Sequence, residues 1–349
     1  MPTLNTTAQL LSHWCSQQLQ TLFSAPCQIL AYPLRVEASH REFYRLQDAL
    51  SDRSWVAMSS PPTLENNEQF VALAKLFHGL GTPKVLAADQ VIGFFLMEDL
   101  GTVHLSDAYL RVGADHTALA DILNLALDAL KPLQKLADPH ISPYTEDRLI
   151  KEFDLCAEWF ARSLMSISLS ADDHNTLAAA RSTLVDAMLE QPQVCVHRDY
   201  HCRNLLLSGD PGSPRIGMVD FQDALIGPAL YDAASLLEDC YAAHDDAVIS
   251  TALHRFASGN EVLAGKAQEQ VRWWHDACAI QRRIKAVGIF ARLHLRDGKS
   301  SHLHYIPSVL ARTSALAAAH DATQMLSPLL GEWAEQAATN SLLTGNNAS

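Results

Sequence analysis

The segment that decides the fold reads HRDYHCRN over residues 197–204, and DFQD follows it at residues 220–223. Among its side chains are the carboxylates of Asp199 and Asp220, 21 positions apart, and the carboxamide of Asn204. A carboxylate beside an acceptor hydroxyl can orient that hydroxyl and take its proton. A second carboxylate and an amide oxygen can hold the Mg²⁺ that bridges nucleotide phosphates. The pattern therefore predicts phosphoryl transfer, with Asp199 as the base and Asn204 and Asp220 as magnesium ligands.

The residues around this segment favour the same interpretation. Short apolar runs at 193–196, 205–207 and 216–219 read as strands, and the Gly/Pro-rich stretch 208–214 reads as a hairpin turn. This arrangement brings the magnesium ligands to the ends of paired strands, close in space although distant in sequence. An accidental match with an ordinary strand-end aspartate is the alternative. The hairpin that links the two motifs argues against it.

Composition and charge bound the protein's class. The 349 residues suffice for two domains, and 48% of them are apolar, enough for a sizeable core. The net charge of −13 argues against a general nucleic-acid binder, which usually carries a basic stripe. A single cleft can still hold an anionic nucleotide, through local cations and Mg²⁺.

The number and spacing of the cysteines and the length of the apolar segments predict the cellular compartment. The seven cysteines are odd in number and form no C-x-x-C, so they predict neither a disulfide framework nor a zinc knuckle. We find no secretory signal and no apolar run long enough for a bilayer. We expect a cytoplasmic protein whose partners are small molecules, with no nucleic acid, membrane or protein partner indicated.

Periodicity divides the chain near residue 100. Residues 1–100 combine expected helices with strands. The helices are 6–23 and 66–80, and the strands are 28–32, 42–46, 54–58, 84–88 and 91–97. Residues 101–349 are mostly helical outside the catalytic strands, with helices expected at 117–136, 146–164, 172–190, 232–241 and 261–295. The fold class is therefore α+β, with a small β-rich N-terminal domain and a larger helical C-terminal domain.

Three stretches carry a resemblance to a known family. They are VHRDY with RNL at 196–205, DFQDA with GP and YD at 220–232, and QRRIKAVGIFAR at 281–292, which RDGK follows at 296–299. On these residues the chain resembles the aminoglycoside phosphotransferase and choline kinase branch of the kinase-like fold. Within that branch it is similar to bacterial cell-wall sugar kinases that phosphorylate the anomeric hydroxyl of N-acetylmuramate and N-acetylglucosamine.

The resemblance implies a two-lobed, protein-kinase-like fold that uses ATP and Mg²⁺, with the nucleotide between the lobes. By motif position it assigns the base to Asp199 and the metal to Asn204 and Asp220. It also implies that the segment Leu96-Met97-Glu98 hydrogen-bonds adenine through its backbone.

The phosphate-binding region departs from the family pattern. The turn at 37–41 contains no glycine, although Ser39 can offer a hydroxyl and backbone N–H groups to phosphate. The third strand lacks the usual phosphate-binding lysine. Arg41 and Arg45 are the nearest candidates to replace it, and the alternative for each is a solvated strand arginine.

Several further residues have a functional and a structural interpretation. Arg203 has a fork suited to phosphate or carboxylate. Asp223 contacts the sugar or the metal's surroundings, or else caps a turn, with both interpretations open. Gln281 is a partner for sugar hydroxyls. Asp232 is expected to be buried and to hold the catalytic loop by accepting from its backbone or from His197.

A cationic cluster lies in the last helix expected from the sequence. It comprises Arg282, Arg283, Lys285 and Arg292. For most of these we expect a solvated face. At least one arginine, assigned to Arg282, is expected to face the cleft and to pair with the lactyl carboxylate of a muramate-type acceptor.

Three functional hypotheses follow. The favoured one is an ATP-dependent kinase for the anomeric hydroxyl of N-acetylated amino sugars. The second is a kinase for another hydroxyl substrate: an aminoglycoside, homoserine, choline or a different sugar. Aminoglycosides and choline are cationic, so their sites would need several cleft carboxylates, whereas a muramate site would need an arginine. The third is a nucleotide-binding pseudokinase, which the glycine-free turn and missing lysine favour and the intact catalytic carboxylates disfavour.

Overall fold

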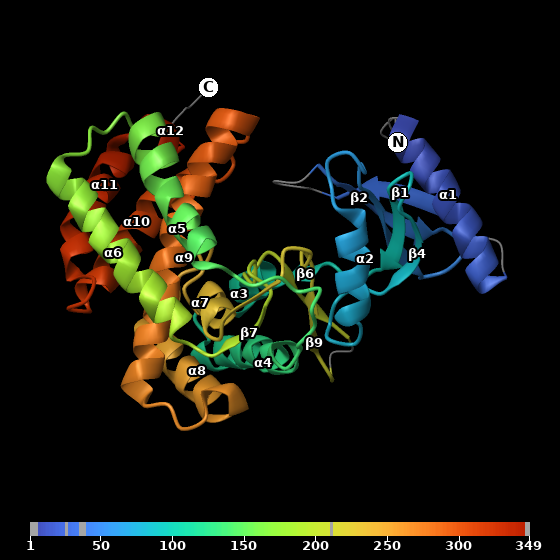
Figure 1. Cartoon of the computed structure of the whole chain (residues 1–349). Coiled ribbons are helices and arrows are strands. Elements are labelled where there is room, and N and C mark those ends of the chain that lie inside the picture. Colours follow the sequence, from blue (N-terminus) through green and yellow to red (C-terminus); the bar gives the residue numbers. More distant parts are fainter. Residues whose placement is uncertain (1–5, 25–26, 35–39, 210–211, 346–349) are drawn as a thin grey trace. The chain divides into compact units, whose positions relative to one another are not determined.

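The structure is a computed structural model that describes residues 6–24, 27–34, 40–209 and 212–345. It separates into two compact units (Figure 1). The first comprises Met1–Val103 and Leu206–Gln222, and the second comprises His104–Leu205 and Asp223–Ser349. The first boundary falls close to the expected residue 100. The hairpin after the catalytic loop is grouped with the first unit instead of the helical one, because it packs with that unit.

A five-stranded antiparallel sheet forms the centre of the first unit. Its strands are β1 (Ile29–Pro33), β2 (Glu42–Asp48), β3 (Ser54–Ser59), β4 (Val85–Asp89) and β5 (Phe94–Glu98), in the order β1-β2-β3-β5-β4. All neighbouring pairs are antiparallel. The five strands confirm the pattern expected from sequence, with bounds that differ by a few residues.

Helices cover both faces of this sheet. Strand β5 directs apolar side chains to each face in alternation, so both faces have apolar surface for a helix to bury. Phe94 and Leu96 join the core cluster that α1 (Thr6–Phe23) forms with Leu11 and Leu19. Phe95 points to the other face and meets Phe70 of α2 (Asn67–Leu76) edge to face, with ring centroids 5.3 Å apart. Figure 1 shows α1 and α2 on opposite sides of the sheet.

The hairpin expected around residues 208–214 is present. Strand β8 (Leu205–Ser208) pairs with β9 (Arg215–Met218) in a three-stranded sheet of order β6-β8-β9, where β6 is Val103–His104. The Met218 N–H donates to the carbonyl of Gly81 at 2.9 Å, which ties β9 to the turn after α2. The chain then reaches Asp220, whose φ of 65° lies in the left-handed region.

The second unit is built from helices around a short two-stranded sheet. Its strands β7 (Gln193–Val196) and β10 (Leu225–Pro228) pair antiparallel. The helices are α3 (Leu105–Val112), α4 (His116–Gln134), α5 (Glu146–Leu155), a π-helix (Cys156–Leu164), α6 (Ala171–Leu189), α7 (Tyr231–Leu237), α8 (Asp246–Ser258), α9 (Gln268–Asp297), α10 (Ile306–Ala318), α11 (Ser327–Thr339) and α12 (Ser341–Thr344), with 3-10 turns at Glu261–Leu263, Leu303–Tyr305 and Gln324–Leu326. The expected helix 146–164 is therefore α5 followed by a π-helical segment.

Helix α9 is the central helix of this unit and is buried on all sides over much of its length. It packs against α5, the π-helix, α6, α7 and α10. Gly288 allows one close approach, because a Cβ atom there would come within 2.4 Å of the carbonyl carbon of Leu155 and 2.6 Å of the nitrogen of Cys156. Helix α9 therefore touches the backbone where α5 passes into the π-helix.

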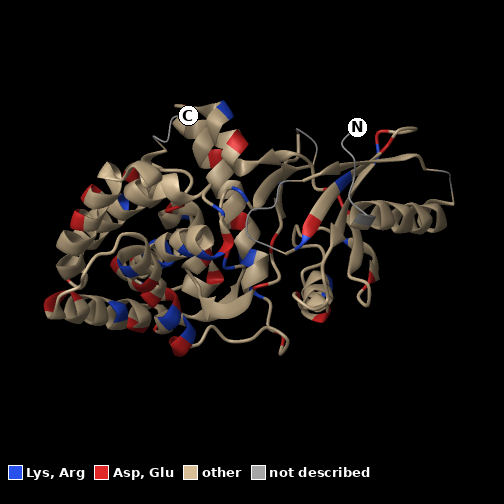
Figure 2. Cartoon of the chain, turned by 90° about the horizontal axis from the view of Figure 1, so that it is seen from above, with Lys and Arg blue, Asp and Glu red and all other residues tan. Residues whose placement is uncertain are grey.

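Charged residues of both signs occur along the described helices of the second unit (Figure 2). Figure 2 shows Lys and Arg interspersed with Asp and Glu along the helical unit. Within the described part of the chain, every helix is too short or too polar to cross a bilayer.

Candidate active site

The catalytic loop begins where β7 ends, and a buried carboxylate fixes its backbone. The N–H groups of His197 and Arg198 donate to the two carboxylate oxygens of Asp232, at 2.6 and 2.9 Å. Asp232 belongs to α7 and is fully buried. These bonds hold Arg198 in the left-handed region at a φ of 75°. The expectation that Asp232 positions the loop is confirmed.

Two further contacts hold the loop. The Cys202 N–H donates to Asp239 at 2.8 Å, and the Tyr200 hydroxyl donates to the carbonyl of Ala126 at 2.7 Å. His197 is buried and lies edge to face with Tyr200, with ring centroids 5.7 Å apart. The loop is thus held from α4, α7 and the segment after α7, which leaves Asp199 in one defined position.

Replacing Asp232 by Asn should loosen this loop. Burial raises the pKa of Asp232 to about 7, although both backbone N–H groups favour the ionised form. An amide has only one acceptor oxygen, so one buried N–H loses its partner, at a cost of about 1–3 kcal/mol. We expect Asp232→Asn to lower the melting temperature and kcat together. The exposed Asp321→Asn serves as control, and an Asp232→Asn variant with unchanged melting temperature and kcat would contradict the assignment.

Asp199 is half-buried and surrounded by cations. Burial alone would raise its pKa, but Lys285 and then Arg198 outweigh burial and lower the pKa to about 2. The carboxylate is therefore ionised at neutral pH. Such a group can accept a hydrogen bond from an acceptor hydroxyl, which is the role that the sequence predicts for it.

Glu152 of α5 organises those cations. Its Oε1 accepts from Arg198 Nη2 at 2.5 Å, and its Oε2 lies 2.8 Å from Lys285 Nζ. The hydroxyl of Tyr144 also donates to Oε2. Burial raises the pKa of Glu152, but Lys285 and Arg198 together lower it below its ordinary value. The loop, α5 and α9 are therefore joined through one buried carboxylate.

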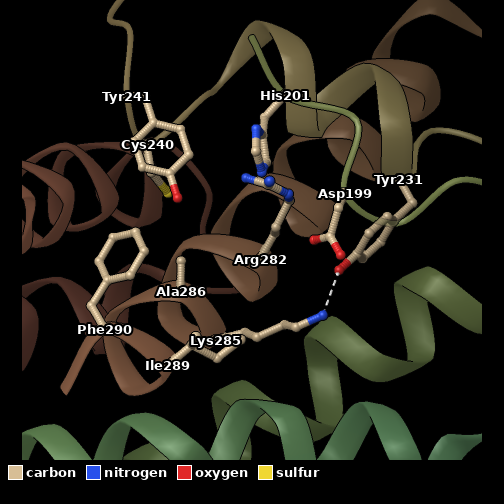
Figure 3. Close-up of a pocket in the computed structure, with 10 residues that line it drawn as sticks. All are labelled: Asp199, His201, Tyr231, Cys240, Tyr241, Arg282, Lys285, Ala286, Ile289 and Phe290. Atoms are coloured by element: carbon tan, nitrogen blue, oxygen red, sulfur yellow. Dashed lines mark hydrogen bonds between the residues drawn. The ribbon is translucent and has the colours of Figure 1, made fainter. Parts of the chain in front are cut away.

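A pocket opens beside Asp199 (Figure 3). On one side Asp199 lies near Tyr231 and Lys285, and Lys285 Nζ donates to the Tyr231 hydroxyl at 3.4 Å. Arg282 occupies the middle of the view, between Asp199 and His201. Apolar walls come from α9 and from the segment after α7, with Phe290 and Tyr241 among them. The pocket therefore combines an ionised carboxylate, two cations and aromatic surface.

The cationic cluster of α9 is not a solvated face, as the sequence had suggested for most of its members. Arg282, Arg283 and Lys285 are all buried, with exposed fractions of 7%, 2% and 8%. Arg283 pairs with Glu238, and Lys285 pairs with Glu152. Sequence reasoning missed both carboxylates because they lie on other elements. One signal in the sequence could have indicated that these cations are buried. Apolar residues surround them on every side of a long helix.

The other expected acceptor contacts do not line this pocket. The Cζ atom of Arg203 lies 3.9 Å from the ring centroid of Tyr241, and its Nη2 donates to the hydroxyl of Tyr305 at 2.6 Å. Arg203 therefore packs against Tyr241, a residue of the pocket wall. Gln281 donates to the carbonyl of Leu149 at 2.8 Å. Asp223 is exposed, and its backbone carbonyl accepts from Arg198. Of the four residues assigned to the substrate, the structure brings only Arg282 to the pocket.

The expected phosphate ligands of the first unit have local partners. Arg45 grips Asp99 through two bonds of 2.7 and 3.0 Å and donates to the carbonyl of Gly101 at 2.7 Å. Its fork therefore fixes the segment after β5. A phosphate contact of Arg45 stays a prediction. Arg41 is buried and lies 3.2 Å from both Ser60 and Glu65. Ser39 lies outside the described residues.

Met97 and Glu98 are the last two residues of β5. Met97 pairs with Val56 on one side and Val85 on the other, and the Glu98 N–H donates to the carbonyl of Lys84 at 2.9 Å. That N–H group already has a partner in the sheet. Adenine binding by this segment stays a prediction.

The two predicted magnesium ligands, Asn204 and Asp220, have the donor chemistry that the ion requires. Asn204 Nδ2 donates to the carbonyl of Asp199 at 3.1 Å, which fixes the orientation of the amide. Asp220 accepts from Gln222 Nε2 at 2.5 Å. Carboxylate and amide oxygens are the ligands that Mg²⁺ prefers. Asn204 belongs to the second unit and Asp220 to the first, and their convergence on one ion stays a prediction.

The antiparallel sheet of the first unit and the braced HRDYHCRN loop of the second define a kinase-like phosphotransferase. A model of the phosphotransferase enzyme family matches residues 32–265. The chain therefore belongs to the phosphotransferase enzyme family.

Relatives agree with this assignment. The chain is 34% identical to the N-acetylmuramate/N-acetylglucosamine kinase of Pseudomonas aeruginosa over 86% of its own length and 88% of the relative's. It is 33% identical to the protein of that name from Neisseria meningitidis, over 78% and 81% of the two lengths. Among solved structures, a Plasmodium vivax ethanolamine kinase shares the fold, with a TM-score of 0.64, 12% identity and coverage of 89% and 90%.

Proposed function

We propose that this chain is an ATP- and Mg²⁺-dependent kinase that phosphorylates the anomeric hydroxyl of N-acetylmuramate and N-acetylglucosamine to give the α-1-phosphates. The names of its relatives support the acceptor class. The observation that carries the proposal is the ionised Asp199 carboxylate at the wall of a pocket large enough to admit part of an acceptor.

Asp199 orients the attacking hydroxyl in this proposal. With a pKa of about 2 the carboxylate is a weak base, so it accepts the hydroxyl's hydrogen bond first. It takes the proton only as the oxygen forms its bond to phosphorus and becomes acidic, as expected for a loose transition state. Magnesium, when held by Asn204 and Asp220, neutralises charge on the phosphates.

The charge of the pocket favours an acidic or neutral acceptor over a cationic one. Arg282 and Lys285 both line it. Aminoglycosides and choline carry positive charge, and like charges brought together in a partly buried site repel. This observation disfavours aminoglycosides and choline, the cationic acceptors of the second hypothesis. The ionised Asp199 disfavours a pseudokinase.

We place the reaction in the cytoplasm, where ATP is available. All seven cysteines are free thiols in the structure, which suits a reducing compartment. The proposed partners are a sugar and a nucleotide.

A panel of acceptors tests the proposal. The purified chain is incubated with ATP and Mg²⁺ and with N-acetylmuramate, N-acetylglucosamine, an aminoglycoside, choline or homoserine, and ADP release is followed. We expect kcat/KM for the two amino sugars to exceed the others by about 100-fold or more. Phosphorus NMR should show an anomeric phosphate. Turnover with a cationic acceptor alone, or a phosphate at another hydroxyl, would contradict the proposal.

A further inference from the structure

Arg282 differs from the other cations near the pocket because, among the described residues, no carboxylate is hydrogen-bonded to its guanidinium. Its side chain is 7% exposed, and among the described residues its Nη1 has no hydrogen-bond partner. Neighbouring Arg283 and Lys285 are each paired with a glutamate. Arg282 is thus a buried guanidinium that lines an open pocket.

Neither nearby carboxylate, Asp239 or Asp199, is hydrogen-bonded to Arg282. Asp239 accepts the N–H groups of Cys202 and Tyr241 at 2.8 and 2.9 Å. Asp199 lies at the pocket wall, and no hydrogen bond joins it to Arg282. Asp199 and Asp239 favour the charged form of Arg282, but its buried Nη1 group still lacks a hydrogen-bond partner, and a ligand can supply that acceptor. The pocket therefore presents a cationic donor, the Nη1 group of Arg282, that an anionic ligand group close to Asp199 could pair with.

A planar carboxylate matches this requirement. The guanidinium fork binds carboxylate with two parallel hydrogen bonds, and Phe290 and Tyr241 offer apolar surface to a sugar ring beside it. We propose that Arg282 binds the lactyl carboxylate of N-acetylmuramate and so sets the preference for this acid over the neutral N-acetylglucosamine. This inference rests on the proposed function. Oxygens of the phosphoryl group in transfer share the same chemistry, and the experiment separates the two sources.

The test compares two acceptors in one variant. For Arg282→Gln and the wild type, kcat and KM are measured with N-acetylmuramate and with N-acetylglucosamine at saturating ATP. The ratio of the two kcat/KM values should shift against the acid by about 10- to 100-fold, the effect of one lost charge-assisted contact, mainly through KM. Arg282→Lys should recover part of the ratio. Arg296→Gln changes an exposed arginine on the same helix and should leave the ratio unchanged.

Binding without turnover gives a second readout. N-acetylmuramate should raise the melting temperature of the wild type more than that of Arg282→Gln, and its neutral methyl ester should not distinguish the two proteins. Circular dichroism of the ligand-free Arg282→Gln protein, compared with that of the wild type, checks that the variant folds.

The outcomes are distinguishable from failure of the proposed function. If the wild type phosphorylates neither amino sugar, the proposed function is wrong. If it phosphorylates both and Arg282→Gln reduces kcat equally for both without changing the ratio, Arg282 contacts the phosphoryl group and the carboxylate inference is overturned.

Discussion

Replacing Asp199 by Asn should lower kcat by about 10²–10⁴-fold, the usual contribution of a positioned general base. The amide has the same size but cannot take the proton of the acceptor hydroxyl. The loop itself should persist, because Asp232 and Asp239 hold its backbone and the Asp199 side chain takes no part in those bonds. Steady-state kinetics with the preferred sugar measure the effect, and circular dichroism checks the fold.

The variant Asp172→Asn provides the matched control. Asp172 is an exposed aspartate in the first turn of α6, and its replacement should leave kcat nearly unchanged. A modest fall in melting temperature is expected for Asp199→Asn, because Lys285, Arg198 and Arg282 lose an anion nearby. An Asp199→Asn enzyme that kept near-normal kcat would show that another group acts as the base.

Replacing Glu152 by Gln should cause the largest loss of stability, about 3–5 kcal/mol in the free energy of unfolding at pH 7. The variant leaves Arg198 and Lys285 buried without their shared anion. Urea-induced unfolding measures the effect. Asp128→Asn is the control, because Asp128 forms exposed pairs with Lys131 and Arg255 and its removal should cost about 0–1 kcal/mol.

The effect of Glu152 should depend on pH in one direction. Its folded-state pKa lies below the ordinary value of 4.5, so its stabilising effect is complete above that value. As pH falls through the lowered pKa, the carboxylate takes up a proton and the stabilisation is lost. The difference in unfolding free energy between wild type and Glu152→Gln should therefore shrink as the pH falls below the ordinary pKa of 4.5. A constant difference from pH 7 to pH 3 would contradict the charge-pair explanation.

Local patterns in the sequence were sufficient for the strands and the catalytic loop. The alternation of apolar residues predicted all five strands of the first sheet, and the HRDYHCRN spacing located Asp199. The structural role of Asp232 was also predicted, as a buried carboxylate that accepts from the loop backbone, and its bonds to the His197 and Arg198 N–H groups confirm it. These features depend on short-range spacing, which a single sequence displays directly.

Long-range charge pairing could not be predicted in the same way. Glu152 lies 46 positions before Arg198, and nothing in the intervening sequence links them. The same limit explains Arg45, whose partner Asp99 is 54 positions away, and Arg203, whose aromatic neighbours lie after α7 and after α9. An arginine's role depends on which acceptor lies within hydrogen-bond distance of its guanidinium group, and tertiary structure determines that proximity.

Laboratory libraries that aim to change acceptor preference meet a constraint at Gly288. Helix α9 supplies Arg282, Lys285 and Phe290 to the pocket, and a side chain at position 288 would push the whole helix away from the end of α5. Such a shift lengthens the separation between Lys285 and Glu152, one turn from the junction. A library that randomises the pocket-lining residues of α9 should therefore keep Gly288. Even alanine at this position would displace Arg282, Lys285 and Phe290 together.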